Sequence, residues 1–186
     1  MKRIIALVLL LSLALSLCAA AAEAGVKTEL GSINLNGAFR LQCSVPESYE
    51  VKIASKDNEG LIALVESEDA SKPRMFLSIE FDETYYDVKR MNDMTEDQLQ
   101  AIVDTFTNDG EEVAVSYRET AHGTKLMMVQ DTLDETSFVA FITVYEGYMV
   151  EFDILPGSEM QGGLTEAQIQ LCVDFLSDLD FIPEEA

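Results

Sequence analysis

Short runs in which apolar and polar residues alternate recur along the chain, and they constrain its fold more than any other feature. Apolar residues stand at every second position in 39–45, and the same rule holds in 75–81. Because successive side chains of a β-strand point to opposite faces of a sheet, each run predicts a strand with one buried face. Apolar stretches predict further strands at 51–53, 61–65, 113–117, 126–129, 138–145 and 148–154.

Two tight turns are predicted between neighbouring strands. Asn36-Gly37 is a strong signal for a two-residue hairpin loop, and Glu146-Gly147 separates two long apolar strands. The stretch 138–145 is apolar at nearly every position, which predicts a central strand covered on both faces. Hairpins of this kind predict a mainly antiparallel sheet.

Two capping boxes predict two helices. Thr95 is followed three residues later by Gln98, and Thr165 is followed by Gln168 in the same way. In this motif the Thr side chain and the Gln side chain each bond a free backbone N–H at the helix start. Apolar residues follow both boxes at helical spacing. We therefore expect an α+β fold, with helices packed on a mainly antiparallel sheet.

The N-terminus has the pattern of a secretory signal peptide. Lys2 and Arg3 precede an apolar stretch at 4–17, and small residues follow it. The apolar stretch is shorter than the roughly 20 residues that a membrane-spanning helix needs. We expect cleavage after Ala22 or Ala24, and therefore a secreted or extracytoplasmic protein.

The remaining chain is predicted to form one domain. Residues 23–31 read as a short N-terminal extension and 32–186 as a single globular α+β domain. Cys18 raises an alternative, in which it is acylated and anchors the protein as a lipoprotein. Leu17 stands where lipoprotein signals want a small residue, which favours the signal peptide.

The charge balance excludes several classes of partner. The chain has 12 basic and 34 acidic residues, a net charge of −22, and loss of Lys2 and Arg3 makes it −24. Nucleic acids and anionic membrane surfaces repel such a chain. No transmembrane segment is expected after signal removal, and the expected partner is a protein or a component of the cell envelope.

The order of elements resembles that of PsbP-like (Mog-type) domains. Val45-Pro46 followed by 47–51 is similar to the opening motif of that family, with Tyr49 where the family has Trp. The long strand pair 138–154 and the closing helix 165–178 match the same layout. The resemblance implies an α/β/α sandwich and a non-catalytic binding or assembly role. It carries over no functional residue.

Cys43 and Cys172 are the two cysteines that follow the signal peptide. Both stand on predicted apolar faces, one on a strand and one on the last helix. Export permits a disulfide between them, and two free, buried thiols are the alternative. Sequence does not give the distance and direction between their Cβ atoms, so both alternatives stand.

The sequence contains no complete set of residues for a common catalytic site. His122, the single histidine, lies in a predicted turn, and Gly157-Ser158 lacks the strand-to-helix frame of a nucleophile elbow. A zinc site needs more His or Cys ligands. Acidic residues are abundant, so paired carboxylates of a glycosidase type keep a small secreted hydrolase as an alternative.

Two weaker candidates concern surfaces. Residues 55–66 partly follow the spacing of a calcium loop, but Ser55 stands where the first Asp ligand belongs. We expect no cofactor, with weak surface binding of calcium left open.

Tyr85 and Tyr86 lie beside three acidic residues and predict an aromatic contact patch, unless one ring packs on the sheet.

The sequence therefore predicts an exported, acidic binding or interaction module that is not an enzyme. The absence of an assembled catalytic set and the signal peptide carry this expectation.

Overall fold

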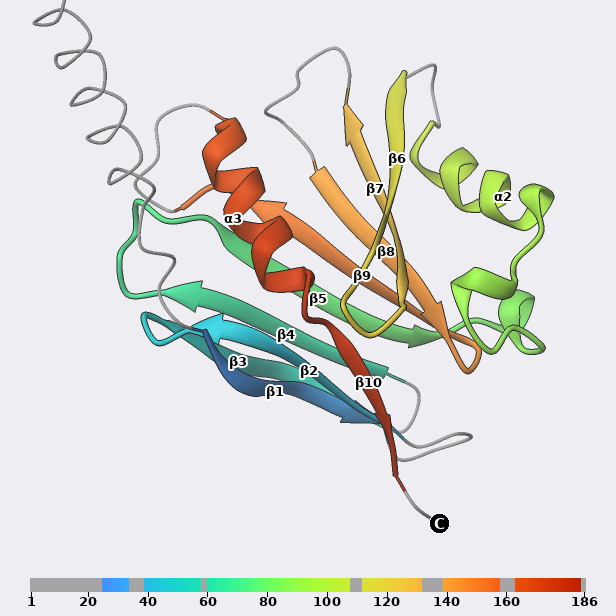
Figure 1. Ribbon diagram of the computed structural model, residues 1–186, viewed down its shortest axis with the longest axis horizontal. Coiled ribbons are helices and arrows are strands. Elements are labelled where there is room, and N and C mark those ends of the chain that lie inside the picture. Colours follow the sequence, from blue (N-terminus) through green and yellow to red (C-terminus); the bar gives the residue numbers. More distant parts are fainter. Residues whose placement is uncertain are drawn as a thin grey trace, which may run out of the picture.

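A computed structural model describes residues 25–33, 39–57, 60–107, 112–131, 139–157 and 163–184 (Figure 1). Within these ranges the strands form two antiparallel sheets. The predicted signal peptide, its cleavage after Ala22 or Ala24, the acylation of Cys18 and the turn at Asn36-Gly37 lie outside the described residues.

The larger sheet has seven strands in the order β3-β4-β5-β9-β8-β7-β6. Every neighbouring pair is antiparallel, as the hairpin signals predict. In spatial order the strands are β3 (Tyr49–Lys56), β4 (Gly60–Ser67), β5 (Arg74–Phe81), β9 (Tyr148–Leu155), β8 (Val139–Tyr145), β7 (Lys125–Asp131) and β6 (Val113–Glu119).

The smaller sheet has three strands, with β2 (Phe39–Pro46) between β1 (Gly25–Ile33) and β10 (Asp180–Pro183). Residues 25–31, expected as a short N-terminal extension, belong to this sheet, because β1 pairs with β2 from Gly25 to Ile33. Figure 1 shows β10 running from the end of the last helix down to this sheet.

Both predicted helices are confirmed, together with their capping boxes. They are α2 (Glu96–Phe106) and α3 (Glu166–Leu176). In each, the N-cap Thr hydroxyl accepts from the backbone N–H of the Gln, and the Gln side chain accepts from the Thr N–H. Two short 3-10 turns, η1 (Glu83–Tyr85) and η2 (Met91–Asp93), connect β5 to α2. None of the described helices has the length and hydrophobicity that crossing a membrane requires.

The strand β8 and the turn that follows it also agree with the prediction. All seven residues of β8 are buried. The turn into β9 has φ of 49° at Glu146 and 80° at Gly147, two consecutive left-handed residues that match the twist of a two-residue hairpin.

The predicted α+β fold, an α/β/α sandwich with helices packed on the sheet, is wrong. Strands hold 55% of the described residues and helices 20%, so the protein has a sheet-rich, mainly antiparallel β fold. The reason lies at the two ends of the domain. Residues 25–33 and 180–183 join β2 in a second sheet, and this sheet covers much of the face where a layer of helices was expected.

The core has two parts, one on each face of the larger sheet. We call the face toward the smaller sheet and α3 the inner face, and the opposite one the outer face. Cys172, Phe175 and Leu176 of α3 pack into the inner core with β1, β2 and β10. On the outer face, α2 and residues 85–94 cover β6, β7 and β8. Figure 1 shows α2 at the β6 end of the larger sheet, away from β1 and β3.

Candidate functional site

An open groove lies between α3 and the inner face of β6 and β7, and we regard it as the candidate binding site. Its volume is about 480 Å³, within the range of small-molecule and peptide-side-chain pockets. The lining comes from two strands and one helix with the residues that precede it: Ala114, Arg118, Met128, Gln130, Asp131, Gly163, Leu164, Thr165, Glu166, Ile169, Gln170 and Val173.

The groove exists because α3 covers only part of the inner face. The helix buries Cys172 and Leu176 in the core, while Ile169 and Val173 also border the groove. On β6, Ala114 and Arg118 point to the groove, since they lie four residues apart and share a face of the strand. Ala114 has a small side chain, so it leaves space in the groove above β6.

The groove combines an apolar floor with a polar rim. Met128, Leu164 and Ile169 supply apolar surface, while Gln130 and Gln170 bring side-chain amide groups to the rim. The NH2 group of Gln170 donates a hydrogen bond to Asp174, and its oxygen is an acceptor. Such a lining can hold apolar side chains and bond peptide or amide groups. Asp131, Glu166 and Arg118 give the rim charges of both signs.

The sequence patterns predict none of these residues as part of a binding site, and Thr165 is predicted only as the N-cap of a helix. The alternation in 113–117 predicts that Ala114 lies on one face of a strand, but the pattern does not say what covers that face. The groove is made by two segments, 114–131 and 163–173, that are more than 30 residues apart in the sequence and that only tertiary packing brings together.

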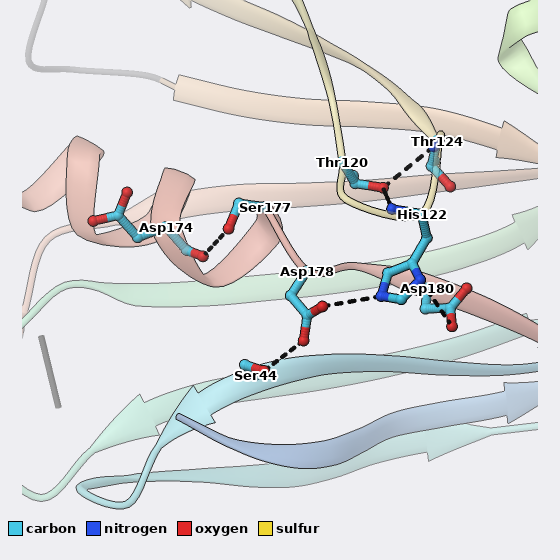
Figure 2. A network of polar contacts seen from close by, with 8 residues as sticks. All are labelled: Ser44, Thr120, His122, Thr124, Asp174, Ser177, Asp178 and Asp180. Carbon is cyan, nitrogen blue, oxygen red and sulfur yellow. Dashed lines mark hydrogen bonds and ion pairs between the residues drawn. The ribbon is translucent and has the colours of Figure 1, made fainter. Parts of the chain in front are cut away.

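His122 lies in a polar network beside the smaller sheet, as Figure 2 shows. Its Nε2 is 2.9 Å from Asp178 Oδ1, and its Nδ1 is 3.5 Å from Asp180 Oδ2. The Ser44 hydroxyl donates to Asp178 Oδ2 at 2.5 Å. The network joins β2, the turn between β6 and β7, and the segment between α3 and β10.

The connectivity of this network differs from that of a serine hydrolase. In a catalytic triad the serine hydroxyl bonds the imidazole, whereas here the Ser44 hydroxyl bonds the carboxylate of Asp178. The bond from Ser44, followed by that from His122, lowers the pKa of Asp178. His122, predicted as a turn residue, is in a turn and exposed. Its contacts indicate a structural clamp between the two sheets.

We expect Asp178→Asn to lower the free energy of unfolding by about 1 kcal/mol, because two charge-assisted hydrogen bonds become weaker. The native pKa of Asp178 is below its ordinary value of 3.8, so this contribution is present above pH 3.8 and is lost as the pH falls through the native pKa. Urea unfolding at pH 7 measures the loss. Asp104→Asn, on the exposed face of α2, is the matched control and should change stability by less than about 0.5 kcal/mol.

Two carboxyl groups lie close together on the outer face of β9. Glu151 and Asp153 are two residues apart on the same face, and a hydrogen bond joins their carboxyl groups. Burial, together with the nearby Asp153 and Glu80, raises the pKa of Glu151 to about 7. Burial also raises the pKa of Asp153, while the bond from Glu151 opposes that shift.

This pair has the wrong spacing for the predicted hydrolase alternative. Glycosidase carboxylates flank the scissile bond and stand roughly 5–9.5 Å apart, whereas Glu151 and Asp153 bond each other directly. Neither residue lines the groove beside α3. The pair shares a proton and leaves no room for a sugar or a water between its members.

The predicted thiols and aromatic patch are placed as follows. Cys43 and Cys172 are free thiols in the inner core. Burial, joined at Cys43 by the charge of Asp178, raises the pKa of each thiol to about 12. A thiol count on denatured, unreduced protein distinguishes this state from the bonded one.

Tyr85 is buried against the outer face, while Tyr86 is 67% exposed and meets the ring of Phe81 edge-on. The two rings therefore do not form one patch.

The described residues contain no group of three or more His, Cys, Asp or Glu side chains arranged to hold a metal ion. In the stretch compared with a calcium loop, Asp57 accepts a hydrogen bond from the backbone N–H of Gly60. That bond is typical of a tight turn.

Comparisons of this chain with protein-family models, with curated proteins and with solved structures found no match. The resemblance to PsbP-like domains therefore stays a prediction that rests on the order of the elements and on the motif around Val45-Pro46. No functional residue is transferred from another protein.

Proposed function

We propose that this protein is an exported, acidic binding module without catalytic activity, and that the groove between α3 and β6–β7 receives its ligand. The groove's lining carries the proposal, because it offers apolar surface and amide groups rather than paired catalytic side chains. The titratable side chains that lie close together elsewhere bond each other: His122 bonds Asp178, and Glu151 bonds Asp153.

The expected ligand is a polypeptide segment of a protein or cell-envelope partner. Met128 and Ile169 suit apolar side chains, and the side-chain oxygen of Gln170 suits a backbone N–H. The net charge of −22 disfavours nucleic acids, whose phosphates need basic residues. Export rests on the signal-peptide pattern of the first 24 residues.

A photo-crosslinking experiment tests the proposal. A photoreactive phenylalanine analogue is placed at Ala114, on the groove floor, and cells that produce the protein are irradiated. We expect a discrete covalent adduct whose mass identifies one main partner, because a side chain at this position lies within contact distance of any groove ligand.

The matched control carries the same analogue at Gln100, which is exposed on α2. An adduct from position 114 and none from position 100 supports the groove as the binding surface. The same adducts from both positions, or none from either, contradict it. Turnover of a glycoside by the wild-type protein and not by Glu151→Gln would support the hydrolase instead.

A further inference from the structure

The four edge strands of the two sheets differ in how they are protected. An open edge exposes unpaired backbone groups, and proteins usually protect it with bulges, prolines, lysines or short length. β1 has a register shift between Glu29 and Gly31, and β3 has one between Ile53 and Ser55. β3 also carries two lysines, and β10 has four residues and ends at Pro183.

The edge strand β6 has none of these devices. It lies at the end of the larger sheet (Figure 1) and pairs with β7 over seven residues without a register shift, proline or lysine. Within the described part of the chain, residues 113–119 have no backbone hydrogen bond outside the β6–β7 ladder. Tyr117 is 46% exposed at this edge. An unprotected, regular edge is a template for an added strand.

We propose that β6 pairs antiparallel with β6 of a second copy of this chain, about a twofold axis at Val115. In this register Arg118 of each copy stands opposite Glu112 of the other, and Tyr117 stands opposite Val113. Opposite charges and aromatic–β-branched pairs are both favourable across antiparallel strands. Moving the axis to Ser116 would place Arg118 opposite Ala114 and remove the charge pair.

The local charge at this edge permits such a contact in a chain of net charge −22. Glu112 and Glu119 are balanced by Arg118 on β6 and Lys125 on β7. Lys125 also lies over the ring of Tyr117, with Nζ 4.5 Å from the ring centroid. The remaining repulsion between two acidic copies is long-range and is screened within about 8 Å at physiological salt. The dimer should therefore become tighter as salt increases.

Pairing would also complete the candidate site. In one chain the groove has a wall at α3 and ends at β6, since its lining comes from α3, β6 and β7. A second copy adds its own β6 and β7 to the floor and its own α3 as the opposite wall. The inference deepens the proposed function and rests on it for the role of this two-walled groove.

Sedimentation of the protein purified after export tests the pairing. We expect a dimer with micromolar dissociation in about 0.15 M salt, because a seven-residue edge gives a small interface. Arg118→Glu places like charges opposite each other twice and should weaken the dimer about tenfold. The double variant Glu112→Arg with Arg118→Glu restores opposite charges and should restore the affinity.

The control Lys56→Glu makes the same change in net charge at the edge of β3, and it should leave the dimer unchanged. A protein that stays monomeric at about 0.5 mM overturns the proposal, since small biological interfaces form at such concentrations. So does equal weakening by Lys56→Glu and Arg118→Glu. A monomer that still yields the crosslinked partner from position 114 would keep the binding function and overturn only the dimer.

A cysteine at the axis tests the register. Residues directly opposite in an antiparallel pair have Cβ atoms about 4.5–5.5 Å apart, close to the separation that a disulfide spans. Val115→Cys should therefore give a covalent dimer on mild oxidation, whereas Val113→Cys faces Tyr117 and should not. Covalent dimer from Val113→Cys, or none from Val115→Cys, contradicts this register.

Discussion

Replacing Phe39 with alanine should lower the free energy of unfolding by about 4 kcal/mol, the largest effect that we expect from a single substitution. Phe39 is fully buried between the two sheets. Its ring meets three other rings edge-on, with centroid distances of 5.1, 5.6 and 5.4 Å to Tyr145, Tyr148 and Phe181. The substitution removes these contacts and leaves a cavity where the smaller sheet joins the larger one.

Urea unfolding followed by circular dichroism measures this loss. Phe76→Ala removes the same number of atoms from a half-buried position on the outer face of β5, and it should cost about 1–2 kcal/mol. A loss below about 2 kcal/mol for Phe39→Ala, or equal losses for the two variants, would mean that the sheets do not meet at this ring.

The second large effect concerns pH and the pair Glu151–Asp153. The native pKa of Glu151 is about 7, above its ordinary value of 4.5. Between these pH values the native carboxyl keeps a proton that the unfolded chain has released. Stability should therefore fall as the pH rises from about 4.5 to 7, and stay low above it. Since Glu151 is partly exposed, we expect a loss of about 1–2 kcal/mol.

Glu151→Gln isolates this contribution. The amide carries no charge at any pH and can still donate a hydrogen bond to Asp153, so the variant should be about 1–2 kcal/mol more stable than wild type at pH 8 and nearly equal at pH 5. Glu47→Gln, at an exposed position, removes the same charge and controls for general repulsion in this acidic chain. Equal stabilisation by both substitutions would show that net charge, and not the pair, sets the pH dependence.

The local elements could be read from the sequence because each depends on residues a few positions apart. The alternation in 39–45 predicts β2, and the boxes at Thr95 and Thr165 predict the starts of α2 and α3. The turn at Glu146-Gly147 was predicted in the same way. Capping and turn hydrogen bonds join residues a few positions apart, and side chains along a strand alternate between its two faces, so neighbouring residues suffice to predict these features.

The arrangement of those elements was decided by contacts between distant parts of the chain. Alternation in 39–45 shows one buried face of a strand, but not whether a helix or a second sheet covers it, and the helix layer expected there was wrong. The carboxyl pair illustrates the same limit: the sequence places Glu151 and Asp153 on one face of β9, while burial raises the pKa of each.

Strands, helices and their ends follow from local sequence patterns, because periodicity and capping act over a few residues. Long-range contacts, in contrast, are the reason that 25–33 and 180–183 join β2 and that α3 leaves a groove over β6 and β7. Both outcomes depend on which apolar faces meet, and an apolar face can be buried by any partner of suitable shape. A pattern of buried positions therefore shows which face of a strand or helix must be buried, while long-range packing determines which element buries it.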